Sequence, residues 1–207
     1  MYLLTELQRD GLQEIFNLGM GQAAASLSEM INEEITLSIP RVLCLSSEEL
    51  ISTLNISSED DICALTQSFQ DNLIKAEAKL IFTEDKSLEL VRTFLNRSVD
   101  LDELTDLEED ALLEIGNVII NSFVSCISDI LKTQFEGTIP VLVKKRLSSL
   151  FVNQNTNLEE DKNDKVVIAG YVDFTIVSKE ITGYLILLLD FNILELFVQN
   201  LLDSMVN

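Results

Sequence analysis

The spacing of apolar residues predicts two long amphipathic helices, one in each half of the chain. Apolar side chains recur at helical intervals through residues 5–32, and residues 105–132 repeat the same pattern. Each segment opens with a threonine, Thr5 or Thr105, and the third residue after it is Gln or Glu, which is typical of a capping box. We therefore expect two helices that begin at corresponding positions of the two halves.

Apolar and β-branched runs between these helices predict strands. The six predicted strands are Glu34–Leu45, Ile62–Phe69, Ile74–Phe82, Gln134–Lys144, Val166–Val177 and Ile181–Leu189. Each half closes with a shorter amphipathic helix, at about 85–96 and 192–205, and the polar stretch 153–164 predicts an exposed loop. The order of these elements predicts an α+β fold, with a layered antiparallel sheet of about six strands flanked by helices.

The two halves also repeat each other in sequence, at an offset of 100 residues. The strongest repeated pattern is Asp, Glu four residues later, Asn three residues after that, and Pro a further 23 positions on. Chance repetition of these four residues at one chosen offset has odds of about one in 10⁵ when each residue type makes up about 5% of a sequence. We interpret the chain as an internal duplication with pseudo-twofold symmetry, in which repeats at about 1–100 and 101–207 form a single domain.

Composition and charge restrict the classes of function. Asp and Glu number 35 against 14 Lys and Arg, so the net charge of −21 argues against nucleic acid and anionic membrane surfaces as partners. The chain contains no histidine, which removes the usual general base and metal ligand. Cys44, Cys63 and Cys126 lie in apolar stretches, as reduced core cysteines do. We expect a soluble cytoplasmic protein with no signal peptide, no membrane insertion and no metal site.

The repeated motif places its polar residues on one face of each long helix. At 100° per residue these side chains share a stripe about 60° wide. They are Asp10, Glu14 and Asn17 in the first helix, and Asp110, Glu114 and Asn117 in the second, where Asn121 extends the stripe. Every amphipathic helix has a polar face, but asparagine is a poor residue for a helix interior. Two asparagines at matching interior positions therefore favour a functional site in each half.

This motif, present twice in about 200 residues, resembles that of the CheC/CheX/FliY phosphatases of bacterial chemotaxis. The segments EIFNLGMGQAAASLSEM and EIGNVIINSFVSCISDIL are similar to the first and second sites of CheC. CheX carries one such site and FliY adds a further domain, so CheC proper matches best. The resemblance implies a pseudo-twofold layered fold in which both long helices lie on one face of the sheet.

The resemblance also implies an activity, which is removal of phosphate from the aspartyl phosphate of a CheY-like response regulator. Asn17 and Asn117 would orient the attacking water, and Glu14 and Glu114 would dock onto the active-site lysine of the regulator. The protein would need no cofactor of its own, because the Mg²⁺ would belong to the regulator. The deamidase CheD is a second partner that the resemblance implies.

Four further motif residues have weaker assignments. We expect Asp10 and Asp110 to cap or orient the helix face, and Pro40 and Pro140 to shape the strand beneath each site. Gly116 and Asn121 stand where the first copy has Phe16 and Gly21, so the two sites are not equivalent.

Three other functions stay open from the residues alone. The two glutamates could form a general acid/base pair of the kind that glycosidases use. The protein could be a non-catalytic binding module for phosphorylated CheY or CheD. It could also have a structural role in a motor or receptor complex.

Overall fold

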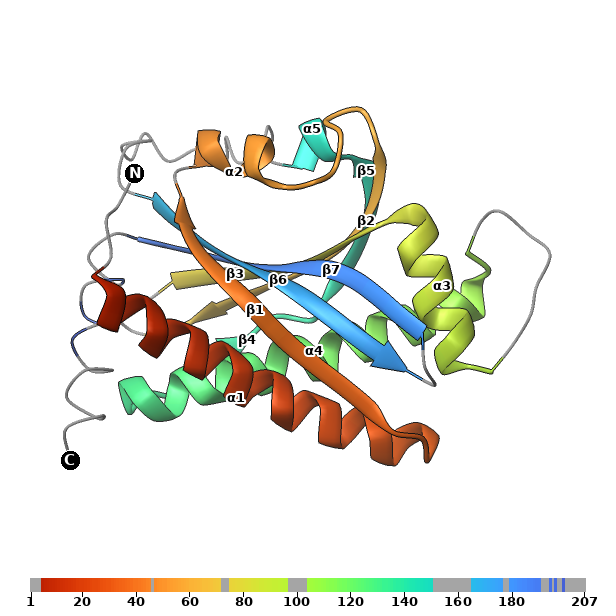
Figure 1. The fold of residues 1–207 in the computed structure, drawn as a ribbon, viewed down its shortest axis with the longest axis horizontal. Coiled ribbons are helices and arrows are strands. Elements are labelled where there is room, and N and C mark those ends of the chain that lie inside the picture. The colour runs from red at the N-terminus through yellow and green to blue at the C-terminus, as the bar shows by residue number, and fades with distance from the viewer. Residues whose placement is uncertain are drawn as a thin grey trace.

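A computed structural model of the chain gives the fold (Figure 1). The structure describes residues 5–45, 47–71, 75–96, 104–150, 165–176 and 179–190, together with Leu194, Leu196 and Gln199. The predicted loop at 153–164, the junction between the halves near 97–102 and most of the predicted C-terminal helix at 192–205 lie outside these residues.

The two long helices begin and end at corresponding residues. They are α1 (Glu6–Ile31) and α4 (Asp106–Leu131), each of 26 residues. In both, the side chain of the N-cap threonine accepts a hydrogen bond from the backbone N–H three residues on, and the Gln or Glu there accepts one from the threonine N–H. The predicted capping boxes are therefore confirmed. Both helices stop at a residue with left-handed backbone, Asn32 or Lys132.

One antiparallel sheet of seven strands covers these helices. Its strands are β1 (Ile35–Leu45), β2 (Asp61–Gln70), β3 (Lys75–Thr83), β4 (Glu136–Gly137), β5 (Val141–Arg146), β6 (Lys165–Ile176) and β7 (Lys179–Asp190). The strand order is β1-β6-β7-β3-β2-β4, and β5 also pairs with β2. The shorter helices are α2 (Ser47–Thr53), α3 (Glu84–Phe94) and α5 (Leu147–Leu150).

The sequence prediction of about six strands is corrected to seven because the predicted strand Gln134–Lys144 is interrupted at Pro140. Proline has no N–H to donate to a ladder and is tolerated only at edges, strand ends and bulges. The segment therefore divides into β4 and β5 on either side of residues 138–140. Pro40 leaves β1 as one strand, but the register of β1 with β6 shifts between Ser38 and Arg41.

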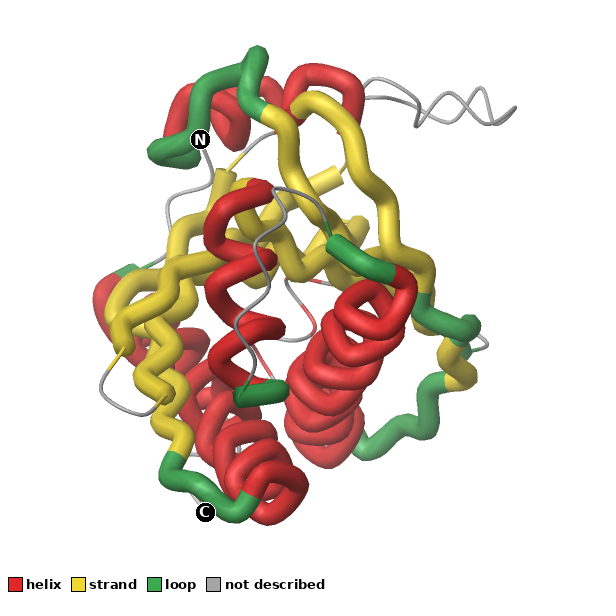
Figure 2. Tube along the Cα trace, turned by 90° about the vertical axis from the view of Figure 1, so that its right-hand side faces the viewer, coloured by secondary structure: helices red, strands yellow, loops and turns green. Residues whose placement is uncertain are grey.

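The sheet separates two layers of helices. Figure 1 shows α1 and α4 running in opposite directions across one face, while α2 and α5 lie on the other, and Figure 2 shows the same arrangement from the side. The larger core lies between the sheet and the long helices, and it contains Cys44, Cys63 and Cys126 as free thiols. A smaller core lies beneath α2 and α5. The expectation of reduced core cysteines is thus confirmed.

Among the described helices, α4 alone is long and apolar enough to cross a membrane by length and composition. Half of its apolar window is buried within the protein, where Phe123 packs against Phe16 of α1. Its position in the larger core accounts for its apolar character.

The elements of the two halves follow the same order, and corresponding strands occupy mirrored places in the sheet. The pairs are β1 with β5, β2 with β6, and β3 with β7. Gene duplication as the origin of this order stays an interpretation of the sequence.

Packing beneath the two long helices differs between the halves. In the first half Phe16 projects from α1 over Gly170 of β6, where an added Cβ atom would lie 3.0 Å from the Phe16 ring. Beneath α4 the helix supplies Gly116 and β2, a strand of the first half, supplies Leu65, so that an added Cβ at Gly116 would overlap a Leu65 methyl group. The bulky residue thus comes from the helix at α1 and from the strand at α4.

A buried ion pair joins the start of α4 to α3. Glu108 is 2% exposed and accepts a hydrogen bond from Arg92 at 2.9 Å. Burial opposes the charged form of Glu108, but hydrogen bonds from Thr105 and Arg92 outweigh it and lower the pKa of this carboxyl. The ion pair therefore stabilises the fold above the unfolded-state pKa of Glu108, and this contribution disappears as the pH falls through the lower folded-state value.

We expect Glu108→Gln to lower the free energy of unfolding by about 1–3 kcal/mol at pH 7. The substitution preserves the capping box, because α1 builds the same cap with Gln8. Chemical denaturation at pH 7 and in the acid range measures the effect. The two proteins should converge in stability at acid pH, and an equal difference at both pH values would contradict this account.

Candidate functional site

The motif residues of the first half lie where α1 crosses the bulge of β1. Asp10 and Glu14 are exposed, whereas Asn17 is half-buried. Glu14 forms no ion pair with any described residue. The helix thus presents a free carboxylate at the surface and, one turn further along, an amide that reaches inward.

Asn17 is held by the backbone of the interrupted strand. Its Oδ1 accepts a hydrogen bond from the Ile39 N–H at 2.8 Å. Gln13, on the same side of α1, donates from Nε2 to the Pro40 carbonyl at 3.1 Å. The bulge at Pro40 frees this N–H and this carbonyl from the ladder, so the helix side chains satisfy them.

The second half places its motif residues in the same way but holds the asparagine differently. Asp110 and Glu114 are exposed and Asn117 is half-buried, and neither carboxylate forms an ion pair with a described residue. Asn117 Oδ1 accepts a hydrogen bond from Asn121 Nδ2 at 2.6 Å, one turn along α4. Asn117 is therefore held by a side chain, whereas Asn17 is held by a backbone N–H.

Behind Asn121 lies Gln67, a buried residue of the neighbouring strand β2. Gln67 Nε2 donates to Asn121 Oδ1 at 3.4 Å and to the Thr138 carbonyl at 2.9 Å. This second bond fixes the chain just before Pro140, as Gln13 fixes the Pro40 carbonyl in the first half. The two halves thus fix corresponding segments through different amide side chains.

The residue before each proline also differs in exposure. Ile39 is fully buried, but Ile139 is 85% exposed, and its neighbour Val141 is 56% exposed. In the first half an added Cβ at Gly170 would lie 3.1 Å from Ile39, so the missing side chain makes room for it. Beneath α4, Leu65 of β2 occupies the position that corresponds to Gly170, so this room is missing. The second site therefore has an exposed apolar rim, which we define as Ile139 and Val141.

The two sites are well separated. Phe16 of α1 packs against Phe123 of α4, with ring centroids 4.4 Å apart, and the helices run in opposite directions (Figure 1). In this arrangement Glu14 and Glu114 lie roughly 16 Å apart along the helix axes, at 1.5 Å per residue. Paired carboxylates in glycosidases lie about 5–9.5 Å apart. This separation argues against the alternative of a shared acid/base pair.

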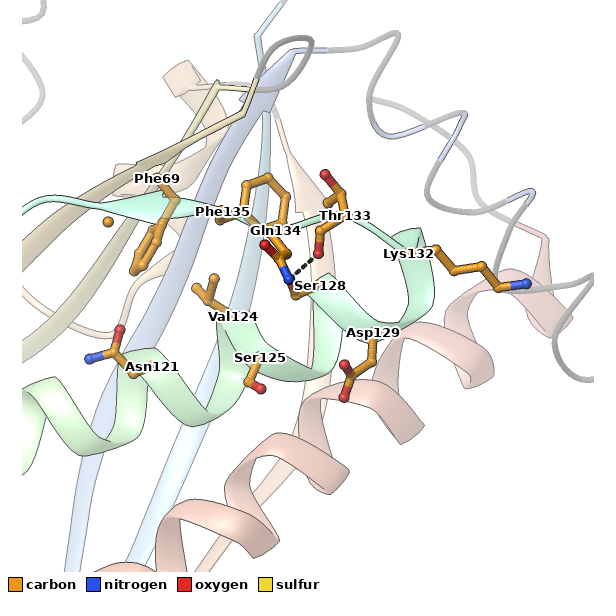
Figure 3. Close-up of a pocket in the computed structure, with 11 residues that line it drawn as sticks. Phe69, Asn121, Val124, Ser125, Ser128, Asp129, Lys132, Thr133, Gln134 and Phe135 are labelled. Atoms are coloured by element: carbon orange, nitrogen blue, oxygen red, sulfur yellow. Dashed lines mark hydrogen bonds between the residues drawn. The ribbon is translucent and has the colours of Figure 1, made fainter.

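An open pocket of about 810 Å³ begins beside Asn121 and follows the C-terminal half of α4 (Figure 3). Its walls come from α4, from the segment 132–137 and from Phe69 of β2. Ser128, which faces this pocket, donates its hydroxyl hydrogen to the Thr133 carbonyl and so fixes the chain that leaves the helix. The described residues contain no group of three or more Cys, Asp or Glu that could hold a metal ion.

Gln67 contributes to the second site although it lies outside the repeated motif. In β2 the residues that face the long helices are Cys63, Leu65, Gln67 and Phe69, so Gln67 is a polar residue in an inward phase. A polar residue at a position of the strand that alternation assigns to the core is the sequence signal that points to Gln67. Periodicity places Asn121 on the polar face of the helix, but its bond to Asn117 depends on side-chain orientation that periodicity does not give.

Comparison with known proteins finds similarity both to a curated sequence and to solved structures. No protein-family model matches the sequence. The CheY-P phosphatase CheC of Bacillus subtilis (strain 168) is 21% identical over 199 residues, which cover 94% of each chain.

Three solved structures share the fold. The FliY structure of Thermotoga maritima has a TM-score of 0.72 at 18% identity, covering 98% of this chain and 99% of that one. The FliM middle domain of H. pylori has a TM-score of 0.64 at 13% identity, with 95% and 99% covered. CheX of Vibrio vulnificus has a TM-score of 0.52 at 14% identity, with 86% and 99% covered.

The chain thus shares with these three structures a fold of one antiparallel sheet with two long helices on one face. The sequence relationship with CheC extends over nearly the whole chain. The chain is thus similar to CheC in sequence and to FliY, CheX and a CheC-like protein in fold.

Proposed function

We propose that this protein is an aspartyl-phosphate phosphatase that acts on a phosphorylated CheY-like response regulator. The observation that carries the proposal is the matched arrangement of both motifs. Each long helix exposes a glutamate without an ion-pair partner among the described residues, and holds a half-buried asparagine one turn further along. The sequence relationship with CheC supports the same activity.

Hydrolysis of an acyl phosphate asks for positioning more than for covalent chemistry. The water oxygen forms a bond to phosphorus while the bond from phosphorus to the aspartyl oxygen breaks. The electron pair of that bond stays on the aspartate, and a proton of the water passes to the phosphate product. Asn17 and Asn117 hold the water in line, so the protein needs no histidine and no nucleophile of its own.

Glu14 and Glu114 dock the regulator in this proposal. An exposed carboxylate on a helix can form a charge-assisted hydrogen bond with a lysine of the regulator active site. The Mg²⁺ that neutralises the phosphoryl group belongs to the regulator. This function places the protein in the cytoplasm, and CheD stays a predicted second partner.

The decay of a phosphorylated CheY-like protein, followed with and without this chain, tests the proposal. We expect the chain to shorten the lifetime of the phosphoryl group in proportion to its concentration. If the chain binds the phosphorylated regulator but leaves its decay unchanged, the protein is a non-catalytic binding module and the proposal is wrong. Unchanged decay without binding would leave neither function.

The exposed apolar rim predicts that the second site contributes more to regulator docking. Burying an isoleucine side chain in an interface contributes about 1.5–3 kcal/mol. We therefore expect Ile139→Ser to raise the regulator concentration for half-maximal activity by about tenfold, with little change at saturation. Leu107→Ser, at an exposed apolar residue of the same half, is the matched control. Equal effects of the two substitutions would contradict a specific role for Ile139.

A further inference from the structure

We propose that Asn121, supported by Gln67, is a positioning residue that fixes the side-chain amide of Asn117 with its nitrogen free for the reaction. The inference rests on the proposed phosphatase function. It states that Asn117 orients the attacking water by donating a hydrogen bond from Nδ2, and not by accepting one at Oδ1. Three amide side chains from two elements form the relay, which we define as Gln67, Asn121 and Asn117.

The hydrogen bonds of the relay run in one direction. Gln67 donates to Asn121 Oδ1 at 3.4 Å, and Asn121 Nδ2 donates to Asn117 Oδ1 at 2.6 Å. An amide whose oxygen is held in this way keeps its NH₂ group on the opposite side. Asn117 Nδ2 has no hydrogen-bond partner among the described residues, and so is available to donate to the attacking water.

Gln67 has the burial and bonding that an anchor for this relay requires. It is 4% exposed, and both Nε2 hydrogens have acceptors, one on Asn121 and one on Thr138. Its Oε1 is buried without a partner among the described residues. A buried acceptor without a partner is costly. We therefore infer that the cost of burying Gln67 is offset by the two hydrogen bonds that it donates to Asn121 and Thr138.

The first site reaches the same result by another route. Asn17 Oδ1 accepts from the backbone N–H of Ile39 at 2.8 Å, so Asn17 also keeps its Nδ2 free of described partners. The first half has Gly21 at the position that corresponds to Asn121, and it needs no side chain there. The Oδ1 atom of the motif asparagine is thus held in both sites, but by different donors. This indicates that both sites require the same orientation of the asparagine side-chain amide.

The test uses the full chain carrying Asn17→Ala, so that only the second site acts. In this background we compare Asn121→Ala, which removes the donor, with Asn121→Asp, which keeps the shape but offers only acceptors to Asn117. Ser125→Ala, at an exposed residue one turn further along α4, is the control. Decay of the phosphorylated regulator gives the maximal rate and the half-saturating concentration separately.

We expect both Asn121 substitutions to lower the maximal rate by about tenfold to 100-fold without changing the half-saturating concentration. Asn121→Asp should be at least as slow as Asn121→Ala, because an acceptor beside Asn117 Oδ1 favours the flipped amide. Gln67→Met should act in the same direction. Full activity of Asn121→Asp, or a change confined to the half-saturating concentration, would overturn the positioning role.

A second readout does not depend on turnover. The side-chain ¹⁵N–¹H₂ signals of Asn117 should shift in Asn121→Ala and Asn121→Asp but not in Ser125→Ala. If the Asn17→Ala background shows no activity, phosphatase function at the second site has failed, and these signals still decide whether the relay exists. Unchanged Asn117 signals in both Asn121 variants would overturn it.

Discussion

Replacing both motif asparagines, Asn17→Ala with Asn117→Ala, should return the decay of the phosphorylated regulator to its autonomous rate. Each asparagine is the group that holds the attacking water in this proposal, and the chain offers no histidine to replace it. Loss of one well-placed polar group at a reaction centre costs about 10²–10³ in rate. Phosphate release or loss of the phosphorylated species over time measures the effect.

The single substitutions separate the two sites. Asn117→Ala should cost more than Asn17→Ala, since the second site also has the exposed apolar rim of Ile139 and Val141. The control pairs Ser26→Ala with Ser125→Ala, at exposed residues on α1 and α4 respectively. A double asparagine variant as active as the unmodified chain would rule out water orientation by these residues.

The second large effect concerns stability rather than activity. Gly116→Ala should lower the free energy of unfolding by about 1–3 kcal/mol, because the new methyl group overlaps the Leu65 side chain in a filled core. Leu65→Ala alone should cost about 2–5 kcal/mol through the cavity it leaves. Equilibrium denaturation by urea measures both.

The double variant tests whether the two residues interact. With Leu65 shortened, the methyl group at position 116 has room, so the double variant should be more stable than the sum of the single losses indicates. Gly21→Ala is the matched control, since an added Cβ there meets nothing within 4 Å. Strict additivity of the Gly116 and Leu65 substitutions would contradict the packing described beneath α4.

Much of the fold could be predicted from local pattern. Apolar spacing located both long helices to within a residue at each end, because a helix that packs on a sheet must bury one face at a period of 3.6 residues. The capping boxes and the strand positions were predictable for similar reasons. The number of strands was not, because breaking the segment around Pro140 depends on which neighbour the strand pairs with.

The candidate site was predictable only in its outer part. Helical periodicity places Glu14 and Asn17, or Glu114 and Asn117, on one face, and the structure puts the glutamates at the surface and the asparagines partly inside. Asn17 has its partner at Ile39, 22 positions away, whereas Asn117 is held by Asn121 of the same helix, whose own partner Gln67 lies 54 positions from it. Such contacts between distant segments have no signature in the local pattern.

What the sequence by itself determined is therefore the pair of helices, their matched polar faces, the reduced core cysteines and the family resemblance. The sequence also showed that the two copies differ, and only the tertiary structure decided what those differences do to the packing and to the two sites. Phe16 of α1 fills the space over Gly170, whereas Leu65 fills the space beneath Gly116 of α4. Because a close-packed interior admits one bulky residue at each such place, Ile39 lies inside and Ile139 outside, and the second asparagine takes its support from a side chain.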